Sequence, residues 1–147
     1  MVIQRIQTLY LLVALVLMAI FAFLTSFTIT TGSGMFQVGA VHHGIVGQTS
    51  PHMLLLCLNA LIVVITAIAI FSYKNLKFQL RLCFISLLLT IALFTSLVVM
   101  AVTGKSEGEL CISFSNIMPI LAIVFIAQAC VGISSDRKLL SDSARIR

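Results

Sequence analysis

Residues 82–104 read LCFISLLLTIALFTSLVVMAVTG and contain no Asp, Glu, Lys, Arg or His. A helix needs roughly 20 apolar residues to cross a hydrocarbon core of about 30 Å, so this stretch is long enough to span a membrane. Three further windows also lack those residue types: 6–41, 53–73 and 110–135. Because backbone groups in lipid must be hydrogen-bonded within their own segment, all four windows are predicted to form helices.

The basic residues lie at the ends of these windows. Of the nine Lys and Arg residues, Lys105 alone lies on one side of the implied membrane. The others lie on the opposite side: Arg5, Lys74, Lys77, Arg81, Arg137, Lys138, Arg145 and Arg147. Cytoplasmic segments beside spans are enriched in Lys and Arg, so both termini are expected in the cytoplasm. The sequence predicts an all-α membrane protein, with four transmembrane helices in an antiparallel bundle of N-in/C-in topology.

Turn residues divide the chain into segments of one integral-membrane domain, 1–147. Helices are expected at about 7–29, 51–73, 80–102 and 110–134. External loops are expected at about 30–50 and 103–109, a cytoplasmic link at 74–80 and a cytoplasmic tail at 135–147. Ser50 and Pro51 are typical of an N-cap followed by the first helical position. Within the first loop, residues 35–41 alternate weakly in polarity, which predicts a short strand or hairpin.

The first window has some features of a secretory signal peptide. Arg5 precedes an apolar run at 9–24, but that run is longer than the usual 7–15 residues. No Ala-x-Ala cleavage motif follows it. A retained first helix is therefore expected.

Composition limits the function classes. The chain is 61% hydrophobic and 9% charged, whereas a soluble domain carries about 25% charged residues. The net charge of +5 is split over short segments beside the spans. It indicates attraction to anionic headgroups of the lipid bilayer, worth about 1 kcal/mol per basic residue. No module or aromatic-interleaved basic face for nucleic acid is present, so nucleic-acid binding is not expected.

Polar side chains inside the predicted spans are candidates for packing within the bundle. Asn59, Thr66 and Tyr73 lie seven residues apart and share one helical face. Asn59 and Asn116 fall at similar depths, which predicts an interhelical hydrogen bond worth on the order of 0.6 kcal/mol. The expected intramembrane packing set is Asn59, Thr66, Ser86, Thr90, Asn116 and Gln128.

The residue types missing from the spans argue against several activities. No carboxylate, Lys, Arg or His lies in the middle of a predicted span, which disfavours a proton-driven transporter. Pro119 is expected to bend the fourth helix, with a neighbouring helix or Ser115 satisfying the freed carbonyl, but no matching broken helix accompanies it. No catalytic constellation is recognisable, so neither an enzyme nor a bound cofactor is expected.

Three histidines, His42, His43 and His52, fall in or beside the longer external loop. With Cys57 or Cys111 they offer imidazole and thiolate ligands for a metal or redox site. Adjacent histidines on a short loop are poor geometry for two ligands, so a solvated polar loop is favoured and no metal is expected. A disulfide between Cys57 and Cys111 and a set of small buried thiols both remain open.

Several short motifs carry a family resemblance. They are IQRIQTLYL at 3–11, Tyr73 to Asn75 with 79–83, Pro119, and a tail with Ile133, Asp136, Leu139, Leu140 and 145–147. The chain resembles a family of small bacterial four-helix inner-membrane proteins known only by a domain-of-unknown-function label. The resemblance implies a fold and a bacterial inner-membrane location, and it supplies no activity. Two departures are the additional Val2 and Ala144, which stands at an acidic position of the family.

The resembling motifs meet at the predicted cytoplasmic end. This face is the candidate site for partners or lipid: Gln4, Arg5, Gln7, Lys74, Asn75, Gln79, Arg81, Asp136, Arg145 and Arg147. The competing interpretation is that the cations set orientation and the amides cap helices. The leading hypothesis is a non-enzymatic accessory or assembly subunit that docks with other membrane proteins or itself. A small transporter or channel for a neutral or hydrophobic solute, and an external His/Cys site, are the alternatives.

Overall fold

The structure is a computed structural model that describes residues 2–32, 34–45, 52–72, 75–105 and 108–145. Its helices are α1 (Val2–Phe23), α2 (Met53–Phe71), α3 (Leu76–Lys105) and α4 (Ile117–Arg145). Its strands are β1 (Thr25–Thr31), β2 (Gly34–Gly39), β3 (Gly44–Ile45) and β4 (Glu109–Ile112), and a 3-10 turn, η1 (Phe114–Asn116), precedes α4. In the described part of the chain, four helices are long and apolar enough to cross a membrane.

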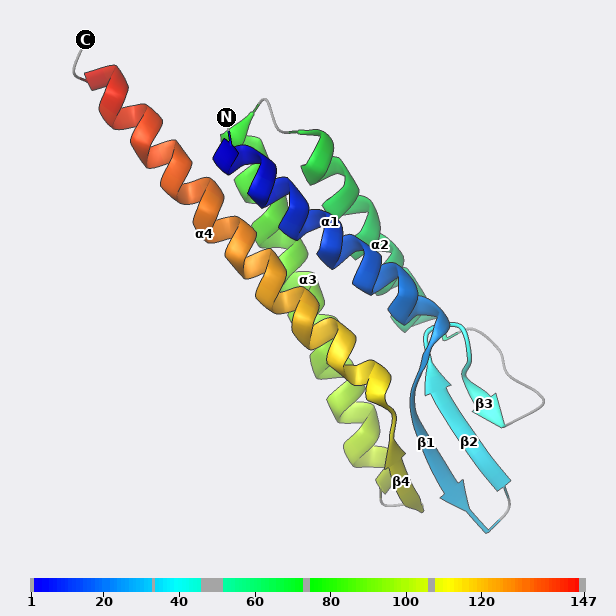
Figure 1. Cartoon of the computed structure of the whole chain (residues 1–147). Coiled ribbons are helices and arrows are strands. Elements are labelled where there is room, and N and C mark those ends of the chain that lie inside the picture. Colours follow the sequence, from blue (N-terminus) through cyan, green and yellow to red (C-terminus); the bar gives the residue numbers. More distant parts are fainter. Residues whose placement is uncertain (1, 33, 46–51, 73–74, 106–107, 146–147) are drawn as a thin grey trace.

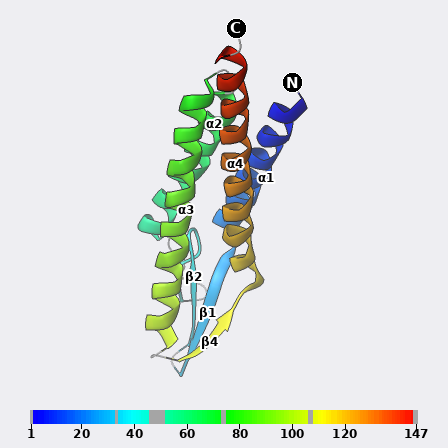
Figure 2. The same cartoon turned by 90° about the vertical axis from the view of Figure 1, so that its left-hand side faces the viewer.

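The four helices lie side by side, and both α1 and α3 pack against α2 and α4 (Figure 1). The start of α1 and the end of α4 lie at one end of the molecule, together with the end of α2 and the start of α3. We call this the helix end. The strands extend from the opposite end, which we call the sheet end, and Figure 2 shows the same separation from the side.

Buried side chains recur every three or four residues along each helix, as expected of one helical face. On α1 and α4 they are Leu11, Ala14, Met18, Phe21, Ala122, Ile126, Ala129 and Ile133. The outward faces are also apolar, with Leu9, Val64, Leu88 and Val131 exposed. Only 28% of each candidate span is buried. This pattern fits helices whose surroundings are themselves apolar.

The four strands form one antiparallel sheet in the order β3-β2-β1-β4. Although β4 is distant in sequence, it pairs with β1, with Phe27 opposite Ile112 and Ile29 opposite Leu110. Phe27 and Ile29 are buried in the same apolar cluster as the helices. A Cβ atom at Gly104 of α3 would collide with the end of the Ile29 side chain, so glycine lets β1 approach α3 closely without a shift of Ile29. The sheet is thus continuous with the core of the helices.

The expectation of an all-α fold is wrong, because residues expected to be helix or loop form this sheet. The first helix ends at Phe23 rather than near residue 29. The segment after it, TSFTITT, is rich in β-branched residues, which favour a strand. The strand predicted within 35–41 is confirmed as β2. The segments expected as an external loop at 30–50 therefore contain strand pairing, with 46–50 outside the described residues.

The expected bounds of the later helices also need correction. The fourth helix begins at Ile117 rather than near 110, because β4 pairs with β1 first. It continues to Arg145, so most of the expected tail is helical. The third helix extends beyond 80–102 at both ends and takes in part of the expected link and turn. The second helix lies within the expected 51–73, whose end residues are outside the described ones.

The residues at the starts of α2 and α4 do not have the roles that the sequence predicted for them. His52, rather than Ser50, caps α2, and its Nδ1 accepts a hydrogen bond from the Leu55 amide at 3.4 Å. Pro119 lies in the first turn of α4, where the lack of an N–H leaves no intrahelical bond broken. The Ser115 hydroxyl donates to the Thr25 carbonyl instead of rescuing a carbonyl freed by a bend.

Candidate functional site

The polar residues between α2 and α3 satisfy one another. Thr66 Oγ1 donates to the Ile62 carbonyl at 2.7 Å, and it lies 2.8 Å from the Ser86 hydroxyl. A hydroxyl has one proton, so Ser86 must be the donor to Thr66. Thr90 donates to the Ser86 carbonyl at 2.7 Å. The structure therefore brings Thr66, Ser86 and Thr90 together as a closed set that joins two helices.

Asn59 is the exception within this interior. Its side chain is 1% exposed, and neither amide atom has a hydrogen-bond partner among the described residues. The predicted bond to Asn116 is wrong. Because α4 begins later than expected, Asn116 lies in η1, where it donates to the Ser26 carbonyl at 2.8 Å. An unsatisfied buried amide costs about 1–3 kcal/mol, so Asn59 is a weak point of the packing.

Gln128 does not join the interior set. It is exposed on α4, whereas Ala122, Ile126 and Ala129 form the buried stripe of that helix. The prediction that Gln128 packs inside is therefore wrong, because the position falls outside the three-and-four spacing of that stripe. A polar path along Asn59, Thr66 and Gln128 is not assembled.

At the helix end, two residues of the predicted face meet across α1 and α4. Gln7 is 4% exposed, and its Nε2 donates to Asp136 Oδ2 at 2.7 Å. Gly132 makes room for this contact, because a Cβ atom there would lie 2.9 Å from Gln7 Cγ. We call Gln7, Gly132 and Asp136 the α1–α4 clasp. A bond to a carboxylate is stronger than one between neutral groups, so the clasp holds these two helices at a defined register.

The remaining residues of the predicted face do not share one environment. Gln79 is buried in the first turns of α3, and its backbone N–H donates to the Asn75 backbone carbonyl at 2.9 Å. Asn75 and Arg81 are exposed. The backbones of Gln4, Arg5 and Arg145 are helical, while Lys74 and Arg147 lie outside the described residues.

The inward orientation of Gln7 and Gln79 had a signal in the sequence. Each continues the buried spacing of its helix, Gln7 before Leu11 and Gln79 before Cys83. Gln7 and Gln79 therefore belong to the buried stripes of their helices and not to one polar face with the exposed cations.

An open groove lies between α3 and α4 near the helix end. Its volume is about 560 Å³. It is lined by Leu80, Arg81, Phe84 and Ile85 of α3 and by Cys130, Val131 and Ser134 of α4. We call it the α3–α4 groove. Its walls are apolar except at the end where Arg81 and Ser134 lie.

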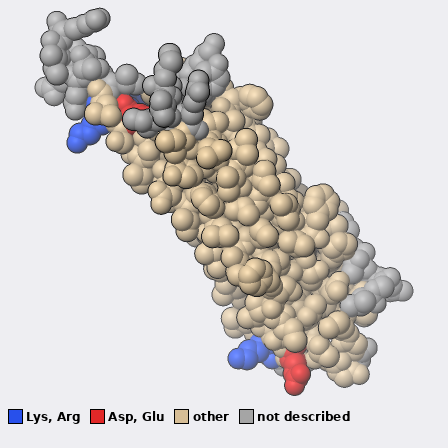
Figure 3. Space-filling view, in the orientation of Figure 1, with Lys and Arg blue, Asp and Glu red and all other residues tan. Residues whose placement is uncertain are grey.

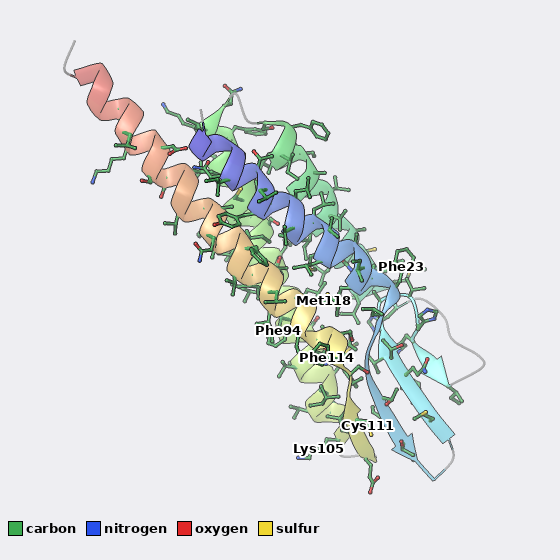
Figure 4. The ribbon with its side chains drawn as sticks, in the orientation of Figure 1. Phe23, Phe94, Lys105, Cys111, Phe114 and Met118 are labelled. Carbon is green, nitrogen blue, oxygen red and sulfur yellow. The ribbon has the colours of Figure 1, made fainter. Side chains whose placement is uncertain are left out.

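A second groove of about 330 Å³ lies at the sheet end. Its lining includes Phe94 and Lys105 of α3, Phe27 of β1 and Ile112 of β4. Figure 4 shows that Phe94, Lys105, Cys111 and Phe114 lie toward the sheet end of the molecule. The sequence did not indicate either groove, because each depends on how α3 and α4 are paired.

The histidines at the sheet end form a ring contact rather than a ligand set. The rings of His43 and His52 have centroids 4.6 Å apart, and Phe36 lies 5.1 Å from His43. Burial, together with the electrostatic effect of the neighbouring His52 ring, lowers the pKa of His43. His42 is exposed. Within the described ranges, no group of three or more His, Cys, Asp or Glu side chains could hold a metal ion.

The cysteines, all four of which lie in the described ranges, are free thiols. Cys57 and Cys111 are both exposed and do not form the disulfide that the sequence left open. Cys83 is buried, and its thiol is in hydrogen-bonding contact with that of Cys130. Cys57 and Cys111 are thus not linked to each other, and Cys83 and Cys130 pack between α3 and α4.

A comparison with known families settles the resemblance. A family model described as "Domain of unknown function (DUF4293)" matches residues 3–146. The chain belongs to this family. The DUF4293 match includes both the clasp at the helix end and the strands at the sheet end. No curated protein matches the chain.

Proposed function

We propose that this DUF4293 chain is a non-enzymatic integral membrane protein that acts as an accessory or assembly subunit for larger membrane partners. In this proposal the four helices cross a bacterial inner membrane as an antiparallel bundle with both termini in the cytoplasm. The observation that carries it is the outward apolar surface, since 28% of each candidate span is buried. Apolar surface on this scale requires lipid or the helices of other proteins as its neighbours.

The charge distribution supports the orientation. Figure 3 shows basic and acidic residues near the two ends of the molecule and an uncharged band between them. The helix end carries Lys77, Arg81, Arg137 and Lys138, whereas the sheet end carries Lys105 and Glu109. An excess of Lys and Arg is typical of the cytoplasmic side of a span.

The interior supports a structural role over the passage of a solute. Ile62, Leu93 and Ile126 are fully buried between the helices. The Thr66 and Ser86 hydroxyls are occupied by each other and by a backbone carbonyl. A small transporter would need polar groups with unused hydrogen-bonding capacity along a path. Asn59 is the buried member of the predicted polar set whose amide atoms have no hydrogen-bond partner among the described residues.

The test is affinity purification from native membranes in mild detergent, followed by mass spectrometry of the co-purifying proteins. We expect a reproducible partner in fixed stoichiometry with the chain. A four-helix membrane protein of similar size, tagged and expressed to the same level, serves as the control. Recovery of the chain as a monomer or homo-oligomer would count against the subunit role and favour the solute alternative. Recovery in the soluble fraction would refute the membrane placement itself.

A further inference from the structure

The α3–α4 groove has an origin in the side chains of its two walls. On α4 the walls are formed by small residues one turn apart, Cys130 and Ser134. On α3 they are formed by longer ones, Leu80 and Phe84. Small residues on one helix facing large ones on the other leave a trough along the seam. Its volume of about 560 Å³ lies within the range typical of sites for small molecules.

One end of the groove is surrounded by cations. Arg81 lines it directly. Lys77 precedes Arg81 by four residues on α3 and therefore lies one turn closer to the helix end on the same face. On α4, Arg137 and Lys138 follow Ser134 by three and four residues, so they lie one turn beyond it. Lys77, Arg81, Arg137 and Lys138 are all exposed.

No carboxylate is among the described side chains that line the groove. Asp136 is the acidic residue among the described side chains of the helix end, and it is bound to Gln7 on the α1 side of α4. The mouth of the groove thus attracts an anion. Its described lining offers no carboxylate as an acceptor for the ammonium or choline group of a zwitterionic lipid.

We propose that the α3–α4 groove binds an anionic glycerophospholipid, with an acyl chain along the apolar walls and the phosphate against Arg81. The long arginine side chain reaches the headgroup level while its stem stays in apolar surroundings. This inference rests on the proposed membrane placement and is independent of the subunit role. The groove at the sheet end provides an internal comparison, because Lys105 is the cation in its lining and Glu109 lies in the adjacent strand.

The test uses the purified full-length chain and native mass spectrometry. Phosphatidylglycerol and phosphatidylcholine with identical acyl chains are added at matched concentrations. We expect the wild-type chain to retain phosphatidylglycerol preferentially. A basic residue near an anionic headgroup is worth about fivefold in affinity, so Arg81→Gln is expected to weaken that binding about fivefold. Lys105→Gln, which removes a cation at the sheet end, is the matched control and is expected to have no effect.

A second variant tests the groove rather than the charge. Val131 is 68% exposed in the wall of the groove, and Val131→Trp is expected to fill the trough and abolish retention of phosphatidylglycerol with all cations in place. Val124 lies two turns earlier on α4 and is also exposed. Val124→Trp is therefore the matched control and should bind lipid like the wild type.

Three outcomes would overturn the proposal. The first is equal retention of the two lipids by the wild-type chain, and the second is equal loss from Arg81→Gln and Lys105→Gln. The third is a dimer that Val131→Trp dissociates, which would show that a second copy occupies the groove. A chain that binds phosphatidylglycerol as expected but co-purifies with no protein would leave this inference intact and refute the subunit role.

Discussion

The helix end and the sheet end are held together in different ways. At the helix end one side chain binds another, Gln7 to Asp136. At the sheet end the acceptors belong to the backbone: the Ser26 carbonyl accepts from the Asn116 side chain and from the Ser113 amide. A backbone acceptor survives most substitutions, whereas a side-chain acceptor is lost with one. The sheet end is therefore built to keep its shape, and the helix end can change its contacts through single substitutions.

The largest expected loss of stability comes from a substitution in the apolar core of the sheet end rather than from one that removes a hydrogen bond. Phe27 is 2% exposed between β1 and the helices. Phe27→Ala is expected to lower the free energy of unfolding by about 3–5 kcal/mol, because it removes a buried ring and leaves a cavity. Thermal unfolding in mild detergent, followed by circular dichroism, measures the loss. Phe114 is 83% exposed at the same end, so Phe114→Ala is the control and should unfold like the wild type.

A smaller effect is expected at the clasp. Asp136→Ala leaves the buried Gln7 amide without its acceptor, which costs about 1–3 kcal/mol. Asp136→Asn keeps an acceptor oxygen and should lose less. The double variant Gln7→Leu with Asp136→Ala removes both partners and is expected to be more stable than the sum of the single losses implies. Strict additivity in the same unfolding assay would mean that the two side chains do not act as a pair.

The four long helices could be predicted from the sequence, since each lies largely within a charge-free window that is long enough to span a membrane. The sheet was largely missed because the same rule cannot distinguish strand from helix. The window 6–41 contains α1, β1 and β2 without a single charge to separate them. The β-branched residues at 25–31 are the sequence feature that distinguishes β1 from helix. The pairing of β4 with β1 could not be predicted from the sequence, because a four-residue strand has no periodic signal of its own.

The candidate site was predicted in part. The inward face of α2 at Asn59 and Thr66 was predicted correctly, and Thr66 meets Ser86 as a packing contact. The prediction for Gln128 was wrong because depth along a helix does not specify which way a residue faces. The predicted bond between Asn59 and Asn116 was wrong because Asn116 lies in η1 before α4 begins. The α3–α4 groove could not be predicted, since it arises where small side chains of one helix happen to oppose large ones of another.

The smallest expected effect is a pH dependence confined to the sheet end. His43 packs between Phe36 and His52, and burial and the electrostatic effect of His52 lower its pKa below the ordinary value of 6.5. A lowered pKa means that the folded state favours the neutral ring. The stability from this environment is complete above pH 6.5 and is lost as the pH falls through the lowered pKa, because the unfolded chain takes up the proton first.

The measurement is the unfolding temperature at pH 7.5 and at successively lower pH in the same detergent. The wild-type chain is expected to lose stability as the pH falls below about 6.5. His43→Phe keeps an apolar ring beside Phe36 and removes the titrating group, so it should reduce that loss, while the exposed His42→Gln should not. Because the clasp depends on a carboxylate at the other end, Asp136→Ala should leave the loss between pH 7.5 and the lowered His43 pKa unchanged. An equal reduction by His42→Gln would mean that the dependence is not a property of the half-buried His43 ring.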